Sequence, residues 1–167
     1  MDESNDEYLY DDAVSVEELV EIESEGGDIS KTGLVVKDET SDVMWLESGN
    51  DEESWIHITA RHIIGTDLDD EGGTSFWPLG QKVKGRPLPD TLDQYEVREL
   101  IYQAVKNGER TPQGEKWKYY FKPTEQGYPD SGISGMRVYV FPSGKIETSY
   151  PMSGSAHTKW ANGEWVE

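Results

Sequence analysis

The chain has 167 residues, 34% of them hydrophobic and 29% charged, and its formal net charge at pH 7 is −19. This length fits one domain, or one domain with an extension, and the low apolar content with six Trp and nine Tyr predicts a small, aromatic-rich core. The absence of Cys excludes disulfides, cysteine-ligated zinc and thiol nucleophiles.

No apolar run approaches the roughly 20 residues that a membrane-spanning helix needs. The N-terminus also lacks the basic segment and apolar run of a signal peptide. We therefore expect no membrane partner and no signal peptide in this chain.

The negative charge is concentrated in the first third of the sequence. Residues 1–54 hold 19 Asp and Glu against two Lys, whereas residues 55–167 hold 15 acids against 13 bases. This contrast predicts an acidic extension over 1–54 and a folded domain over 55–167. Three interpretations of the extension remain open: a solvated disordered tail, the surface of a halophilic protein, or a polyanionic segment that shields a basic face.

Within the extension, residues 1–12 are acidic and aperiodic and are expected to be disordered. A short helix is predicted over 15–23, because Ser15 can cap it and Glu18 follows three residues later. The β-rich runs 33–37 and 43–47 predict a hairpin, and 47–54 is a candidate linker. Little hydrophobic core is expected from this segment.

The next segment, 55–63, is predicted to be a helix capped by Ser54, which we favour over a strand that would alternate Ile56 and Ile58 with His57 and Thr59. Helical spacing places Ile56 on one face with Ala60 and Ile63, and it places His57 and Arg61 four residues apart on another. A loop is expected over 65–80, with Phe76 and Trp77 anchoring its end.

The strongest helix signal covers 90–108, with Asp90 or Asp93 as the cap and Gly108 ending the helix in a left-handed conformation. Three strand-like runs follow, at 116–122, 135–141 and 145–151. The order predicts an α+β fold: N-terminal helices packed on a small antiparallel meander, preceded by the acidic extension.

The last two strands predict a polar face. A two-residue turn at Ser143 and Gly144 would pair Phe141 with Ile146, Tyr139 with Thr148, and Arg137 with Tyr150. The strand period of two then places four side chains on one face: Arg137, Tyr139, Thr148 and Tyr150. A guanidinium, a hydroxyl and two phenols suit a phosphodiester, although an ordinary solvent-exposed sheet face remains the alternative.

The preceding strand adds Lys118 and Tyr120, which lie on the same face because they are two residues apart. Interleaved cations and aromatic rings suit single-stranded nucleic acid, because phosphates pair with cations while bases stack on rings.

The pair His57 and His62, with Arg61 between them, forms a second candidate site. Histidine can take or give a proton near neutral pH, and a cation can stabilise charge that builds on phosphate oxygens. The alternative is that each histidine is merely structural, as we expect for His157. A metal site from His57, His62 and Asp67 is disfavoured because a spacing of five is poor on one helix face.

Together, the segments "WIHITARHI", "ELIYQAVKNG" and "GISGMRVYVFPSGKIETSYP" resemble the nuclease fold shared by barnase, EndoU, the tRNA-cleaving colicins and RelE. The resemblance covers about residues 55–151 and is strongest to the toxin- and phage-associated branches. It implies a metal-independent endoribonuclease without cofactor, acting on RNA such as tRNA, with an immunity or antitoxin protein as a further partner. It also implies a cytoplasmic location, or delivery as part of a larger toxin.

By position, the resemblance makes His57 the general acid/base, Arg61 the phosphate cation, and His62 a second proton-transfer group or helper. Thr148 and Tyr150 would lie at the scissile phosphate. Lys118 and Arg137 would contact substrate phosphates more weakly, with Tyr120 and Tyr139 as further substrate-binding candidates. The acidic extension departs from this fold and keeps a second hypothesis open, a non-catalytic acidic binding or inhibitor protein of halophilic or phage origin.

Overall fold

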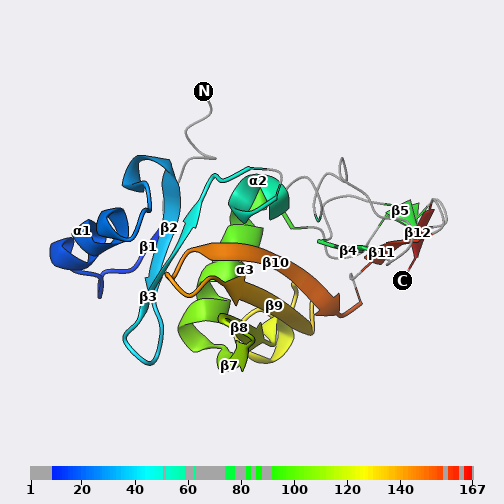
Figure 1. The fold of residues 1–167 in the computed structure, drawn as a ribbon. Coiled ribbons are helices and arrows are strands. Elements are labelled where there is room, and N and C mark those ends of the chain that lie inside the picture. Colours follow the sequence, from blue (N-terminus) through cyan, green and yellow to red (C-terminus); the bar gives the residue numbers. More distant parts are fainter. Residues whose placement is uncertain are drawn as a thin grey trace.

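The computed structural model describes residues 9–50, 52–58, 62, 74–77, 82–83, 86–87, 92–155, 158–161 and 164–166. Over these residues the protein is mixed α+β, which confirms the predicted class (Figure 1). Its main β-structure is an antiparallel four-stranded sheet in the order β10-β9-β8-β7 and a mostly antiparallel three-stranded sheet in the order β1-β2-β3. None of the helices within the described ranges is long and apolar enough to span a bilayer.

The four-stranded sheet is a meander. It consists of β7 (Glu109–Gln113), β8 (Lys116–Phe121), β9 (Gly135–Val140) and β10 (Ile146–Ser153). Strands β8 to β10 match the predicted runs. Strand β7 was not predicted, because its sequence ERTPQ has no apolar alternation. It forms by pairing with β8, and its proline is tolerated because β7 is an edge strand.

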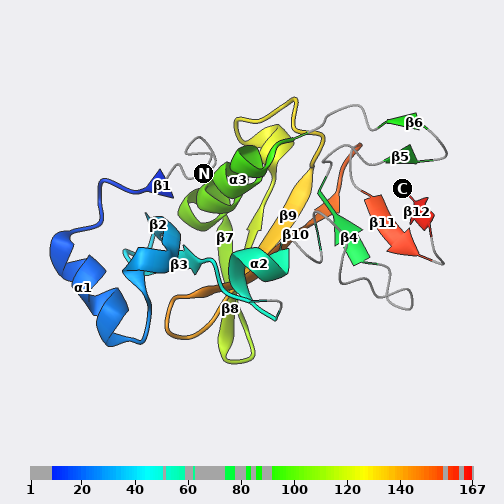
Figure 2. The same cartoon turned by 90° about the horizontal axis from the view of Figure 1, so that it is seen from above.

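Helix α3 (Gln94–Asn107) lies along one face of this sheet (Figure 2). Asp93 caps it in a capping box with Glu96, as one of the two predicted caps. The helix ends at Gly108, but the predicted left-handed conformation is wrong, since this residue is extended at φ −79°. Glycine is needed there for space: a Cβ would lie 2.3 Å from the Ala104 carbonyl oxygen.

The predicted hairpin is present as β2 (Thr32–Lys37) and β3 (Val43–Glu47). Both of its faces are covered. Leu34, Val36, Met44 and Leu46 join the core formed by α3 and the four-stranded sheet, while Val35 and Trp45 face the other way and pack with Ile22. The expectation that the acidic extension has little hydrophobic core is therefore wrong for residues 32–47.

Ile22 belongs to α1 (Val16–Ser24), the predicted short helix, which Ser15 and Glu18 cap as expected. Strand β1 (Leu9–Tyr10) pairs in parallel with β2, so the predicted disorder is wrong for these two residues. The predicted disorder is also wrong for residues 11 and 12, where the buried Asp11 side chain forms an ion pair with Lys106. Residues 1–8 of the aperiodic segment lie outside the described residues.

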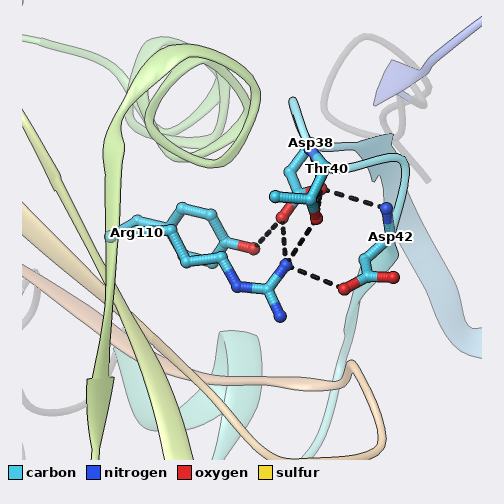
Figure 3. Close-up of polar contacts among 5 residues, drawn as sticks. Asp38, Thr40, Asp42 and Arg110 are labelled. Atoms are coloured by element: carbon cyan, nitrogen blue, oxygen red, sulfur yellow. Dashed lines mark hydrogen bonds and ion pairs between the residues drawn. The ribbon is translucent and has the colours of Figure 1, made fainter.

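A polar cluster ties the β2–β3 turn to the four-stranded sheet (Figure 3). The Arg110 guanidinium of β7 donates to the carboxylates of Asp38 and Asp42 at 2.7 and 2.8 Å. Asp38 also accepts from the Tyr119 hydroxyl at 2.6 Å and from the backbone and hydroxyl of Thr40. The acidic turn is therefore locked to the sheet by a buried, multiply bonded carboxylate.

Helix α2 (Ser54–Ile58) packs against β10. The predicted cap is wrong, because the Ser54 hydroxyl donates to the Ile146 carbonyl. Ile56 is exposed, whereas Ile58 is fully buried. Most of the predicted loop 65–80 lies outside the described residues. Its end contains β4 (Thr74–Phe76) and the fully buried Trp77, which confirms the predicted anchoring by Trp77.

The remaining elements are short. Strand β4 pairs with β11 (Thr158–Ala161), which pairs with β12 (Glu164–Val166). Strands β5 (Lys82–Val83) and β6 (Arg86–Pro87) form a small hairpin. Single 3-10 turns lie at Ile29–Lys31 and Pro123–Glu125.

Candidate functional site

The polar residues of the β9–β10 hairpin form the predicted pairs, but the turn and the strand register that produce these pairs differ from the prediction. Thr148 pairs with Tyr139, and Tyr150 pairs with Arg137, as expected. The predicted pairing of Phe141 with Ile146 is wrong, because Ile146 lies opposite Val140.

The reason is a pair of compensating changes. The turn spans three residues, with Gly144 at φ +110° and the Phe141 amide bonded to the Lys145 carbonyl. A β-bulge between Ile146 and Thr148 then adds Glu147 to β10. The bulge shifts the register back by one residue and turns Thr148 and Tyr150 to the face of the sheet opposite α3.

Two histidines and two tyrosines form a continuous series of ring contacts beside this hairpin. The His57 and His62 rings meet edge-on with centroids 5.7 Å apart, and His62 lies 5.2 Å from the Tyr150 ring. The Tyr150 and Tyr139 rings stack at 6.0 Å. Aromatic side chains from α2, β9 and β10 therefore meet in one place.

The meeting place is a surface hollow of about 490 Å³, which we name the tyrosine hollow. Four predicted site residues are among its lining residues: His57, Tyr139, Thr148 and Tyr150. His62 does not line it. This side chain is buried behind His57 and Tyr150, which fits a helper better than a group that touches a ligand.

Arg137 lies beside the two phenols, since it pairs with Tyr150 and is close enough to Tyr139 for their charges to interact. Burial opposes its charged form, but hydrogen bonds with Tyr150 and Tyr139 outweigh burial and raise the pKa of the guanidinium. Burial and the hydrogen bond to Tyr139 raise the pKa of Tyr150 to about 12. Tyr150 is therefore a neutral phenol at physiological pH, and its hydroxyl donates to the Tyr139 hydroxyl at 3.4 Å.

Thr148 carries a hydroxyl with no hydrogen-bond partner among the described residues, although its Oγ1 is buried. Leaving a buried hydroxyl unsatisfied costs about 1–3 kcal/mol. Such an atom in a residue that lines a hollow is a candidate partner for a bound ligand.

The sequence analysis missed five lining residues: Glu52, Gln113, Glu115, Lys116 and Glu147. Lys116 shares the alternating face of Lys118 and Tyr120, so the strand period could have identified it. It is paired with Glu147, its Nζ lying 2.8 Å from both carboxylate oxygens. With three carboxylates, one lysine and a histidine, the lining is more acidic than the sequence predicted.

Three substrate-binding candidates, Lys118, Tyr120 and Arg137, lie on the same sheet face but outside the lining. Lys118 pairs with Tyr139 across the strands. The Tyr120 hydroxyl lies over Gly135, where a Cβ would approach it to 2.4 Å. Arg61 lies outside the described residues, so its predicted contact with phosphate stays a prediction.

No three potential metal-ligating side chains gather within the described part of the chain. That the site works without a metal stays a prediction, which RNA cleavage in the presence of a chelator tests.

These features define a mixed α+β protein with a histidine- and tyrosine-lined hollow on the face of its meander opposite α3. No protein-family model matches the sequence, and no curated protein matches it either. The resemblance to the barnase, EndoU, colicin and RelE nuclease fold therefore stays a prediction.

Proposed function

We propose that the protein is a metal-independent endoribonuclease whose scissile phosphate binds in the tyrosine hollow. One observation carries the proposal: His57 from α2 lines the same concavity as Thr148, Tyr139 and Tyr150 from the β9–β10 hairpin. RNA cleavage by acid/base chemistry uses a proton-transfer group together with donors that stabilise charge on the phosphate oxygens.

The chemistry follows from these groups. His57 takes the proton of the ribose 2′-hydroxyl, the 2′-oxygen attacks phosphorus, and the bond from phosphorus to the 5′-oxygen breaks. The neutral phenol of Tyr150, with a pKa of about 12, can supply the proton that the leaving 5′-oxygen needs. Thr148 and Tyr139 donate to the phosphate oxygens, and His62 supports His57 and Tyr150 from behind.

In this proposal residues 55–167 are the nuclease-like domain, and residues 1–54 are an appended acidic segment whose hairpin has become part of the core. The substrate is RNA, such as tRNA, and a toxin-like effector of this kind acts in the cytoplasm or is delivered there. An immunity or antitoxin protein would be its natural partner.

The direct test is cleavage of labelled RNA by the full chain in excess EDTA, over a salt range that includes molar KCl, because phosphate contacts weaken as salt rises. We expect products with 2′,3′-cyclic phosphate and 5′-hydroxyl ends. A DNA strand of the same sequence lacks the 2′-hydroxyl and should stay intact. Intact RNA at every salt concentration would end the proposal.

A second candidate function, a non-catalytic acidic binding protein, is favoured by the charge of the lining. Glu52, Glu115 and Glu147 surround the hollow, and only Glu147 is paired with Lys116. A basic partner would then bind without cleavage. Removing residues 1–54 would also remove β2 and β3 from the core. The matched test is therefore to replace the exposed lining acids Glu52 and Glu115 by glutamine in the full chain. Loss of partner binding in these variants, with unchanged binding in His57→Ala, would favour this function.

Replacing Thr148 by valine is expected to separate function from stability. Valine is nearly isosteric and removes a hydroxyl that has no partner among the described residues, so the free energy of unfolding should be unchanged or slightly higher. RNA cleavage should fall by about 100-fold if this hydroxyl binds the phosphate in the transition state.

The control is Thr111→Val. Thr111 pairs with Lys118 in the same row of the sheet and does not line the hollow. Strands β8 and β9 lie between Thr111 and Thr148. Urea unfolding and RNA cleavage rates, measured on both variants, show whether the Thr148 hydroxyl contributes to cleavage rather than to stability. A Thr148→Val variant that cleaves at the wild-type rate contradicts the assigned role.

A further inference from the structure

Ser54 has an unusual backbone conformation. It lies at φ +67°, a left-handed region that residues with a Cβ rarely occupy. Among the described residues, Ser41 at φ +72° is the other non-glycine with positive φ. Ser41 is exposed in the β2–β3 turn, whereas Ser54 is fully buried.

The surrounding loop holds Ser54 in this conformation. The Asn50 amide donates to the Glu53 carbonyl, and the Ile56 amide donates to the Ser48 carbonyl at 2.8 Å. Gly49 makes room, because a Cβ there would lie 2.5 Å from the Ser54 Cβ. Strain of this kind persists where the surroundings over-determine it, and it is concentrated at functional sites.

Ser54 joins the two elements that meet at the tyrosine hollow. It is the first residue of α2, which carries His57 three residues later. Its hydroxyl donates to the Ile146 carbonyl at 2.8 Å, a contact between residues 92 positions apart. Next to it, Glu53 forms an ion pair with Lys145.

The Ile146 carbonyl, which accepts the hydrogen bond from Ser54, lies at the start of the bulge in β10. Ile146 pairs with Val140, Glu147 is the inserted residue, and regular pairing resumes at Thr148. The hydrogen bond from Ser54 therefore joins α2 directly to the point of β10 where the side chains are turned toward the hollow. Losing it would free α2 to shift relative to Thr148 and Tyr150.

We propose that Ser54 is a positioning residue that sets the geometry between His57 and the β10 bulge. This inference rests on the proposed ribonuclease function, since it assigns Ser54 the alignment of that site. Its role is to hold the proton-transfer group where it meets the bound phosphate, without touching substrate.

The test is Ser54→Gly in the full chain. Glycine removes the hydroxyl but accepts positive φ, so the variant should fold. We expect kcat for RNA cleavage to fall by about 100-fold with KM nearly unchanged, because misplacing a reacting group by about 1 Å costs this much. Ser41→Gly makes the same change at the same kind of backbone position away from the hollow, and it should cleave like wild type.

Proton NMR gives a readout independent of cleavage. Cross-peaks between the His57 ring of α2 and the His62 ring, which lies against Tyr150, should weaken in Ser54→Gly. Cross-peaks between Tyr139 and Tyr150, within the hairpin, should persist. If the wild-type protein does not cleave RNA, the proposed function fails. The positioning role of Ser54 is then tested by the cross-peaks alone.

Unchanged cross-peaks, or wild-type kcat, in folded Ser54→Gly would overturn the inference. If Ser54→Gly does not fold, Ser54→Ala keeps the Cβ and removes only the hydroxyl, and the same two measurements apply to it.

Discussion

Replacement of His57 by alanine is expected to lower RNA cleavage by about 10²- to 10⁴-fold, the usual contribution of a positioned acid or base. His57 is the one histidine that the structure describes in the lining of the tyrosine hollow. Its removal leaves Thr148, Tyr139 and Tyr150 in place, so phosphate binding should change less than turnover. The measurement is single-turnover cleavage in EDTA, with KM determined separately.

The matched control is Ile56→Ala. Ile56 is the preceding residue of the same helix, but its side chain is 45% exposed and does not line the hollow. Truncation there tests whether any shortened side chain on α2 lowers the rate. Equal loss in both variants would mean that α2 is only a structural element, and full activity in His57→Ala would remove its assigned role in proton transfer.

The second large effect is on stability. Replacing Asp38 by alanine should lower the free energy of unfolding by about 3–5 kcal/mol, the usual cost of removing one partner from a buried ion pair. The Asp38 side chain is 2% exposed and bonds Arg110, Tyr119 and Thr40. Its loss leaves the Arg110 guanidinium with a much weaker partner and opens the contact between the β2–β3 turn and the sheet.

Asp42→Ala is the control for that variant. Asp42 pairs with the same guanidinium nitrogen, but its side chain is 57% exposed, so we expect a loss below about 1 kcal/mol. Urea unfolding of both variants is the measurement. Similar losses would show that burial is not what makes the Asp38 contact strong.

The same cluster predicts the acid limit of stability. Burial would raise the pKa of Asp38, but hydrogen bonds from Tyr119, Thr40, the Asp42 amide and Arg110 outweigh it and hold the pKa below its ordinary value of 3.8. Burial also opposes ionisation of Asp11, and bonds from Lys106 and from the Ala13 and Lys37 amides again lower the pKa.

A folded-state pKa below the unfolded value stabilises the protein above about pH 4, and this stabilisation is lost as pH falls further. We therefore expect a steep loss of stability below about pH 4 in wild type and a shallower one in Asp38→Asn, measured by thermal unfolding across pH. Equal slopes would contradict the assignment to Asp38.

The sequence by itself determined the local elements that carry strong signals. Ser15 with Glu18, and Asp93 with Glu96, predicted the starts of two helices because capping depends on residues three positions apart. The alternation along β8, β9 and β10 predicted three strands. These features are determined by neighbours in the chain, so composition and spacing reveal them.

The tertiary structure decided what depends on distant partners. Strand β7 exists because β8 pairs with it, and the acidic hairpin joins the core because Leu34 and Leu46 pack with residues of α3 and the four-stranded sheet. The bulge at Glu147 and the bond from Ser54 to Ile146 have no local signal, since the partners of Ser54 lie 92 residues away. Charge alone suggested a detached arm, because net charge reports solubility and partners but does not show which apolar side chains are buried.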